Sequence, residues 1–376
     1  MTLHIVQPAL PTYRVAFFRE LQQELSKRGA HLRVYASPRD FLGVESVPPD
    51  GFEADLQSNL SVHLRGHAFW QGGLHVPLAR ADVLVINGNP RLFSNYALWL
   101  RAKLLGIPVI WWGQGWSAGS HGGRSEVRQI IMRLADVVLL YSDKEREEYI
   151  SRGFAAYRTF ALNNGLDIES IDRVSAEWNR EKIAAFRKAN GLDAYNYWCI
   201  FLGRLTRKSE IGLLIESLPA IRGDVGIIAL GDGPVAREAK EAARALGVCA
   251  RVRWVGAQFD ENAIAPWMLS ASAFVYPGTV GLSLIHAFAY GLPAVVHRDE
   301  RWHMPEFAAF ENSLNGLAFE RGSATSLART VNELFADGER RAAMGKRGRD
   351  LVHRTFNVKD MTRRFMEAVD GIGIEF

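Results

Sequence analysis

The chain of 376 residues contains only two cysteines, Cys199 and Cys249, and no C-x-x-C pair. Both lie in apolar stretches, so we expect buried free thiols in a reducing compartment and no disulfide framework. The start lacks a basic segment followed by an apolar run, and no window approaches the ~18–20 apolar residues that cross a membrane. The sequence therefore predicts a cytoplasmic protein.

The chain also lacks an excess of one charge. Lys and Arg number 45 against 41 Asp and Glu, a formal net charge of +4. Residues 1–170 hold 18 against 16, which leaves 27 against 25, so neither half has a basic arm or an acidic tail. A nucleic-acid surface needs clustered charge, which argues against a nucleic-acid partner. No acidic D-x-D pair occurs and the ten histidines are scattered, so we expect no metal site.

Short apolar runs alternate with helix-period segments along the whole chain. The length favours two domains, and the 48% hydrophobic content allows a sizeable core. Strands are predicted at 3–7, 32–37, 82–88, 108–113, 137–142 and 159–164, then at 198–203, 225–231, 252–256, 273–277 and 293–297. This alternation predicts α/β architecture, with two Rossmann-like domains whose doubly wound parallel sheets face a ligand-binding cleft.

The domain boundary is expected near residue 168. An N-terminal domain would cover 1–168 and a second domain 169–355. The last segment, 356–376, is predicted as a helix that packs back on the first domain. Residues 175–191 read as one polar, amphipathic helix at the start of the second domain.

Residues 277–293 read "PGTVGLSLIHAFAYGLP" and contain the first candidate site. A strand would end before Gly278, and a helix would begin after Gly281. Free amides and the dipole at a helix start favour an anion, and glycines let a phosphate approach closely. His286, one turn beyond Leu282, can offer its imidazole to a sugar hydroxyl. An ordinary strand-to-helix turn, with a histidine satisfied by backbone, fits the same pattern.

The order of motifs around this stretch is distinctive. "FLGRLTRKSEIGLLIESL", "ALGDGP", "VRWVGA", the 277–293 stretch and "MPEFAAFENSLNGLAF" follow one another. In this order they resemble the C-terminal half of family 4 glycosyltransferases, GT-B enzymes that transfer sugars from nucleotide donors with retention. "YRVAFFRELQQEL", the "GQGW" loop and "NNGLD" in the first half are similar too. The resemblance implies donor binding in the second domain and acceptor binding in the first.

The resemblance also assigns donor-site residues. Arg204 is similar to the family's "GR" arginine, which neutralises donor phosphates. The family's next lysine aligns with Ser209, and Lys208 would supply that charge. Fixed cations suit this chemistry because negative charge grows on the leaving diphosphate. Glu306 of the "PE" pair would shape the loop under the nucleotide. The implied donor-binding set is Gly203, Arg204, Lys208, Gly231, Gly278, Thr279, Val280, Gly281, Leu282 and His286.

The chain departs from the family at a pair of glutamates eight residues apart. Gly278 and His286 stand at those two positions. His286 would replace the glutamate that binds the nucleotide ribose. Gly278 has no side chain for the donor sugar, so Thr279 or the backbone would act there, or the sugar differs from the usual hexoses. Gly281 and Gly291 are kept, which indicates a divergent branch.

In the first domain Gln114 stands where the family has a histidine, and it is a catalytic candidate with Arg204 and Lys208. An amide can bind a sugar hydroxyl but does not change charge near neutral pH. His121 could serve instead, or be incidental to a glycine-rich loop. The further acceptor-side candidates are Asn87, Asn89 and Arg91, which follow a strand end, and Tyr13 and Arg14, which stand where the family has a glycine-rich loop.

The resulting hypothesis is a retaining, metal-independent glycosyltransferase of hexosyltransferase type, without a cofactor. It would move a sugar from a UDP- or GDP-sugar to a glycan or lipid-linked glycan of a surface polysaccharide. The helical stretches 95–112 and 124–135 mix apolar, aromatic and basic residues, which suits either peripheral membrane contact or an ordinary core-facing stripe. A nucleotide-sugar epimerase, which would need its own acid and base carboxylates in the cleft, and a non-catalytic binding relic, which would have no need for phosphate ligands such as Arg204, are the alternatives.

Overall fold

The computed structural model describes residues 1–40, 43–63, 68–115 and 123–373, and only the backbone of 123–127. The chain divides into two compact units, Met1–Asp167 with Val358–Phe376, and Ile168–Asn357. The boundaries expected at 168 and 356 lie within two residues of this division.

Unit 1 is built on a parallel sheet of seven strands in the order β3-β2-β1-β6-β7-β8-β9. Helices cover both faces, so its strands are apolar runs whose residues alternate between two cores: Trp111 faces one and Trp112 the other. A separate antiparallel hairpin, β4-β5, accompanies the sheet. The strands are β1 (Thr2–Val6), β2 (His31–Tyr35), β3 (Glu53–Asp55), β4 (Asn59–His63), β5 (Ala68–Gly72), β6 (Val83–Asn87), β7 (Val109–Trp112), β8 (Val137–Leu140) and β9 (Thr159–Ala161). The helices are α1 (Thr12–Lys27), α2 (Phe93–Leu104), α3 (Gly123–Leu134), α4 (Asp143–Ser151), η2 (Ala156–Arg158) and α13 (Val358–Asp370).

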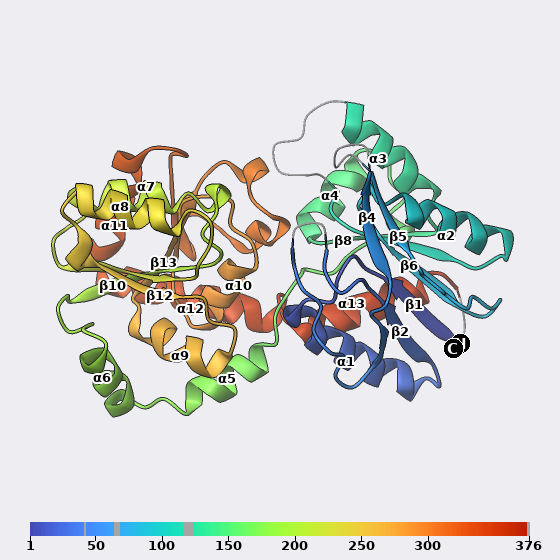
Figure 1. Ribbon diagram of the computed structural model, residues 1–376, viewed down its shortest axis with the longest axis horizontal. Coiled ribbons are helices and arrows are strands. Elements are labelled where there is room, and N and C mark those ends of the chain that lie inside the picture. The colour runs from blue at the N-terminus through green and yellow to red at the C-terminus, as the bar shows by residue number, and fades with distance from the viewer. Residues whose placement is uncertain (41–42, 64–67, 116–122, 374–376) are drawn as a thin grey trace. The chain divides into compact units, whose positions relative to one another are not determined.

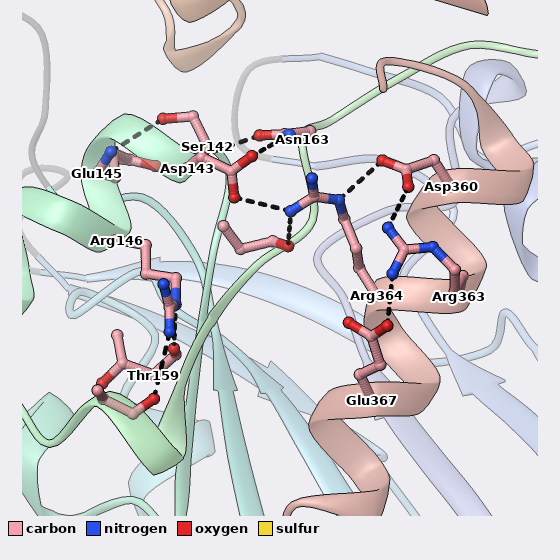
Figure 2. A network of polar contacts seen from close by, with 12 residues as sticks. Ser142, Asp143, Glu145, Arg146, Thr159, Asn163, Asp360, Arg363, Arg364 and Glu367 are labelled. Atoms are coloured by element: carbon pink, nitrogen blue, oxygen red, sulfur yellow. Dashed lines mark hydrogen bonds and ion pairs between the residues drawn. The ribbon is translucent and has the colours of Figure 1, made fainter. Parts of the chain in front are cut away.

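The C-terminal helix α13 packs on unit 1, as predicted. Figure 1 shows it in red beside the blue helix α1. The ring of Phe365 meets Phe17 of α1 edge-on at 5.8 Å and Trp112 of β7 at 6.0 Å. At the surface Arg364 donates to Asp143 of α4 and to Asp360, both at 2.7 Å (Figure 2). An apolar face and an ion-pair network therefore attach α13 to the first unit.

Unit 2 holds six parallel strands in the order β12-β11-β10-β13-β14-β15. Two further strands lie on each side of the central β10–β13 pair, which is the doubly wound order of a Rossmann-like domain. The strands are β10 (Tyr197–Leu202), β11 (Val225–Leu230), β12 (Val252–Gly256), β13 (Ala273–Tyr276), β14 (Ala294–His297) and β15 (Gly316–Phe319). The helices are α5 (Ile168–Ala176), α6 (Arg180–Ala189), η3 (Arg207–Ser209), α7 (Ile211–Ser217), η4 (Leu218–Ala220), α8 (Ala236–Ala245), η5 (Cys249–Arg251), α9 (Glu261–Ser270), α10 (Leu282–Ala289), η6 (Glu300–Trp302), η7 (Pro305–Ala309), α11 (Ala324–Ala336) and α12 (Gly338–Arg354).

Two expectations are wrong. The single helix expected over 175–191 is two helices, because Asn179 caps α6 by accepting the Lys182 amide at 2.9 Å. Both cysteines are free, but Cys249 is exposed in η5 while Cys199 is buried in β10. A short apolar stretch does not by itself bury its cysteine. Among the described residues, no helix is long and apolar enough to cross a membrane.

The Phe365→Ala substitution tests the packing of α13 on unit 1. Removing a ring that contacts both α1 and β7 leaves a cavity, and we expect a loss of about 3–5 kcal/mol in the free energy of unfolding. Urea denaturation followed by circular dichroism measures it. The control is Phe259→Ala, whose side chain is 88% exposed and should change stability little. Equal effects of the two substitutions would contradict the packing described.

Candidate functional site

The carboxyl edge of the unit 2 sheet is held together by backbone contacts at glycines. A Cβ on Gly231 would lie 1.9 Å from the Gly203 carbonyl oxygen, and Gly231 itself has a φ of 150°. A Cβ on Gly278 would lie 2.0 Å from the Lys208 carbonyl oxygen. The loops after β10, β11 and β13 therefore touch without intervening side chains. The structure brings the predicted donor-loop positions 203, 208, 231 and 278 together.

The contact at Gly278 explains the missing glutamate. Any side chain there would collide with the η3 turn unless that turn moved. The turn itself is fixed by Ser209, whose hydroxyl donates to the Thr206 carbonyl at 2.7 Å and accepts the Thr206 amide at 3.1 Å. Ser209, at the position where the resemblance implies a lysine, is therefore a buried structural residue.

Three cations surround this turn. Arg204 follows β10, while Arg207 and Lys208 belong to η3, and all three side chains are exposed. Within the described part of the chain none has a carboxylate partner, in contrast to the many paired arginines elsewhere. Their charge is therefore available to an anion at this edge of the sheet. The assignment of Arg204 and Lys208 to donor phosphates stays a prediction.

The loop before α10 uses part of its own hydrogen-bonding capacity. Thr279 donates its amide to the Lys208 carbonyl at 2.9 Å, and Val280 donates its amide to Nδ1 of His303 at 3.2 Å. These two loop amides are therefore not available to a ligand, whereas the expectation of free amides concerned the start of the helix. The amides of Gly281, Leu282 and Ser283 at the start of α10 have no acceptor among the described residues. The free amides at the positive end of the α10 dipole are therefore those of these three residues.

His303 is a buried residue that the sequence did not single out. Its Nδ1 accepts the Val280 amide, and its Nε2 lies 2.9 Å from the His297 carbonyl, which fixes the neutral tautomer with the proton on Nε2. The ring also stacks on Phe307 at 4.0 Å. Burial lowers the pKa of His303 to about 4. His303 is therefore a neutral side chain whose hydrogen bonds hold the 277–281 loop in place.

His286 makes a contact that neither sequence interpretation anticipated. Its Nε2 lies 2.9 Å from Oε1 of Glu261 in α9, and the Tyr290 hydroxyl donates to the same oxygen at 2.5 Å. Because a carboxylate only accepts, Nε2 carries the proton and Nδ1 is the ring atom left for a ligand. Burial opposes ionisation of Glu261, but the hydrogen bonds from His286 and Tyr290 lower its pKa.

Unit 1 has a similar carboxyl edge. Gly88 and Gly113, which follow β6 and β7, touch so closely that a Cβ on Gly113 would lie 2.6 Å from the Gly88 Cα. Their neighbours are the predicted Asn87, Asn89 and Gln114. The Asn87 side chain donates to Gln7 Oε1 at 2.9 Å and accepts the Asn89 amide at 3.0 Å. These hydrogen bonds of Asn87 fix the backbone at this edge, so the asparagines have a structural role there.

The remaining acceptor-side candidates differ in their exposure, although the Arg14 guanidinium lies only 5.4 Å from the centre of the Tyr13 ring. Arg91 is exposed, with its guanidinium 5.1 Å from the centre of the Phe69 ring. Tyr13 is exposed and Arg14 is buried. His121 lies outside the described residues.

Glu145 is a further residue that the motif search missed. It is fully buried, and its two carboxylate oxygens accept the amides of Gly115 at 2.9 Å and of Tyr141 at 3.0 Å. It thereby fixes the backbone that carries Gln114. The spacing of Ser142 and Glu145, a capping-box signature, was the available signal.

The comparison with family models matches most of the second unit. Residues 182–351, which lie within unit 2, match the family Glycosyl transferases group 1. The lipopolysaccharide core biosynthesis glycosyltransferase LpsE of Rhizobium meliloti (strain 1021) is 28% identical over 171 residues, which are 44% of this chain and 47% of LpsE. The match thus spans about half the length of that relative.

Solved structures extend the likeness to the whole chain. HepE of Anabaena in complex with UDP has a TM-score of 0.73 at 17% identity, covering 98% of this chain and 99% of that chain. HepE is also solved with UDP-glucose. WaaG, a glycosyltransferase involved in lipopolysaccharide biosynthesis, has a TM-score of 0.64 at 15% identity, with 98% and 99% covered. The predicted fold, two Rossmann-like parallel-sheet units as in GT-B glycosyltransferases, is confirmed.

The Gly278→Ala substitution tests the close backbone contact between Gly278 and η3. A methyl group 2.0 Å from the Lys208 carbonyl must displace backbone, so we expect a loss of about 1–3 kcal/mol in the free energy of unfolding. Gly212→Ala in α7 is the matched control, since no atom lies within 4 Å of its added Cβ and alanine favours a helix. Thermal unfolding compares the two. A Gly278→Ala protein as stable as wild type would contradict the geometry.

His303 predicts a dependence of stability on pH. Its pKa is about 4 in the folded protein against 6.5 in the unfolded chain. Below pH 6.5 the unfolded chain therefore binds a proton at this histidine that the folded protein does not, and stability falls as the pH drops toward 4; His303 contributes roughly 3 kcal/mol to this fall. Thermal unfolding between pH 4 and 7.5 should show a weaker dependence in His303→Gln. His31→Gln, at an exposed position, should keep the wild-type dependence; equal curves for all three would refute the assignment.

Proposed function

We propose that the protein is a retaining, metal-independent glycosyltransferase that uses a UDP- or GDP-sugar as donor. The observation that carries this proposal is the group of unpaired cations Arg204, Arg207 and Lys208 beside the start of α10, inside the segment that matches the group 1 family. UDP and UDP-glucose in the HepE structures support a uridine nucleotide. The likeness to LpsE and WaaG supports a lipopolysaccharide or other surface glycan as acceptor.

The chemistry assigned to these residues is electrostatic. As the bond between the sugar and the diphosphate breaks, negative charge grows on the leaving phosphate. Arg204 and Lys208, with the amides at the start of α10, would stabilise that charge without a metal ion. Nδ1 of His286 would accept a hydrogen bond from a hydroxyl group of the donor nucleotide sugar, because Glu261 holds the ring proton on Nε2.

The acceptor side of the mechanism rests on unit 1. The departing diphosphate would take the proton of the acceptor hydroxyl as that hydroxyl attacks the face the diphosphate leaves, which preserves the anomeric configuration. Gln114 would orient the acceptor, because Glu145 accepts the amide of the next residue, Gly115, and so fixes the backbone there. The cleft between the two carboxyl edges stays a prediction.

Peripheral membrane contact is part of the proposal. Helix α2 exposes Leu100 and Leu104, the latter to 81%, beside the basic Arg101, whereas Lys103 is paired with Asp136. Exposed apolar side chains beside a basic one favour an anionic membrane surface. A lipid-linked glycan would then be an accessible acceptor.

Thermal-shift titration against UDP, GDP, dTDP and CMP, without added metal, tests the donor site. One diphosphate should stabilise the folded protein by about 2.7 kcal/mol at a hundredfold excess over its Kd. We expect Arg204→Gln to lose this shift because it removes the cation nearest the end of β10. Arg329→Gln, an exposed arginine of α11, is the control. Absence of a shift with all four nucleotides would disprove the proposal and favour a binding relic.

A further inference from the structure

The β4–β5 hairpin of unit 1 presents an exposed tryptophan. Trp70 of β5 is 44% exposed, and among the described residues its ring has no aromatic or cationic partner. Side chains alternate between the two faces of a strand. The register therefore places the polar and small neighbours of Trp70 on its own face, namely Asn59, Ser61 and His63 of β4 and Gly72 of β5. We call these five residues the outer face of the hairpin.

The polar side chains of the outer face keep hydrogen-bonding capacity for a ligand. The Ser61 hydroxyl donates to the Trp70 carbonyl at 3.1 Å, so its oxygen accepts from Nε2 of His63 at 2.9 Å. Nδ1 of the exposed His63 is then left as an acceptor. Asn59 is also exposed, and its side-chain amide has no partner in the described part of the chain. An aromatic ring thus lies among unused donors and acceptors.

Gly72 leaves one edge of the ring uncovered. A Cβ at this position would lie 3.8 Å from Cδ1 and 4.0 Å from Nε1 of Trp70. A larger side chain would therefore cover this edge of the indole. Glycine in a strand interior weakens the strand and often marks a place where another molecule approaches closely. The choice of glycine favours access to the ring over the stability of the hairpin.

The hairpin also lacks charge. Asp, Glu, Lys and Arg make up 23% of the chain, which would give between five and six of them in a stretch of this length. Residues 56–79 contain one, Arg65, which lies outside the described residues. A single exposed aromatic side chain is ordinary on a protein surface, but one set among neutral amide, hydroxyl and imidazole groups is a more specific arrangement. An anionic membrane or a phosphate would need basic side chains, so this surface favours a neutral ligand.

Hydrogen bonds of β5 join the hairpin to the carboxyl edge of the unit 1 sheet. The Phe69 amide donates to the Arg91 carbonyl at 2.7 Å, and the Gln71 side chain donates to the Gln7 carbonyl at 3.1 Å. The Gln7 side chain in turn accepts from Asn87 at 2.9 Å. Arg91 and Asn87 are both predicted acceptor-side residues. The hairpin is therefore continuous with the edge at which the acceptor is expected.

We propose that Trp70, with Asn59 and His63 beside it, binds a sugar ring of a neutral glycan. The C–H groups on one face of a pyranose pack against the electron-rich face of an aromatic ring. The hydroxyl groups of the sugar would donate to Nδ1 of His63 and exchange hydrogen bonds with the Asn59 amide. The proposal rests on the proposed function for one point, that this glycan is the acceptor. A ring held on the hairpin would then make the acceptor an oligosaccharide, which reaches beyond the strand ends.

Binding of the full chain to a printed array of neutral, sulfated and sialylated oligosaccharides tests the site. We expect wild type to bind neutral oligosaccharides and Trp70→Ala to bind them about tenfold more weakly, as the loss of one stacked ring implies. Trp70→Phe keeps a ring and should retain most of the binding. Tyr157→Ala is the matched control, because Tyr157 is another aromatic residue of unit 1 and is 77% exposed. It should bind like wild type.

UDP separates this site from the proposed donor site. Trp70→Ala should keep the thermal shift that UDP gives wild type, since the hairpin belongs to unit 1 and the donor loops belong to unit 2. If no nucleotide shifts wild type, the proposed glycosyltransferase function fails, while the array still decides on the sugar site. A normal UDP shift with unchanged glycan binding in Trp70→Ala would refute the sugar site alone.

The remaining outcomes are also decisive. Trp70 is partly exposed, so Trp70→Ala should melt close to the wild-type temperature; if it fails to fold, His63→Ala replaces it and should weaken glycan binding severalfold. Absence of binding by wild type to every neutral oligosaccharide on the array would overturn the proposal. Sedimentation with vesicles of phosphatidylglycerol and phosphatidylcholine that is lost in Trp70→Ala would do the same, because it would assign the ring to a membrane surface.

Discussion

Direct contact between backbone segments at strand ends is the constraint on which both carboxyl edges depend. In unit 2 the η3 turn lies against Gly278, and Gly231 lies against Gly203. In unit 1 Gly88 and Gly113 touch in the same way. Loops this close leave no room for side chains at the contact itself. Functional groups must therefore come from the positions on either side, which is where Arg204, Lys208, Asn87 and Gln114 are found. The same constraint accounts for a glycine at 278, because a carboxylate there is incompatible with the η3 turn in its present position.

Contacts this tight also need the loops to be held, and buried polar side chains do this in both units. His303 holds the 277–281 loop through one ring nitrogen and a carbonyl through the other. Glu145 holds the backbone at Gly115 and at Tyr141. Each is nearly inaccessible to solvent and each has its hydrogen bonds directed at backbone, so neither is suited to contact a substrate. The distinction between groups that bind ligands and groups that position loops follows from burial and partners, not from residue type.

The sequence predicted the framework because the framework is local. Each of the parallel strands expected from apolar runs is present, and so is the helix that returns from the C-terminus. The β4–β5 hairpin was missed because its residues are partly exposed and lack the apolar run of a central strand. The partner of His286 could not be predicted, since Glu261 lies 25 residues away on another helix. Ser209 shows the same limit: the resemblance gave it no role and assigned the phosphate charge to Lys208, whereas its hydroxyl closes the η3 turn.

Two arginines of unit 1 show how the surroundings of a side chain decide whether its charge is balanced within the protein. Arg364 is partly exposed and holds two carboxylates at 2.7 Å, so its charge is balanced within the protein and its role is to attach α13. Arg14 lies deeper, against Trp112, with no oxygen acceptor in the described part of the chain. Residues that only stabilise a fold gain nothing from an unpaired charge in a core, because an apolar side chain of similar size packs as well without the desolvation cost. The two arginines therefore differ in what surrounds their charge: two carboxylates for Arg364, and aromatic rings with a thioether for Arg14.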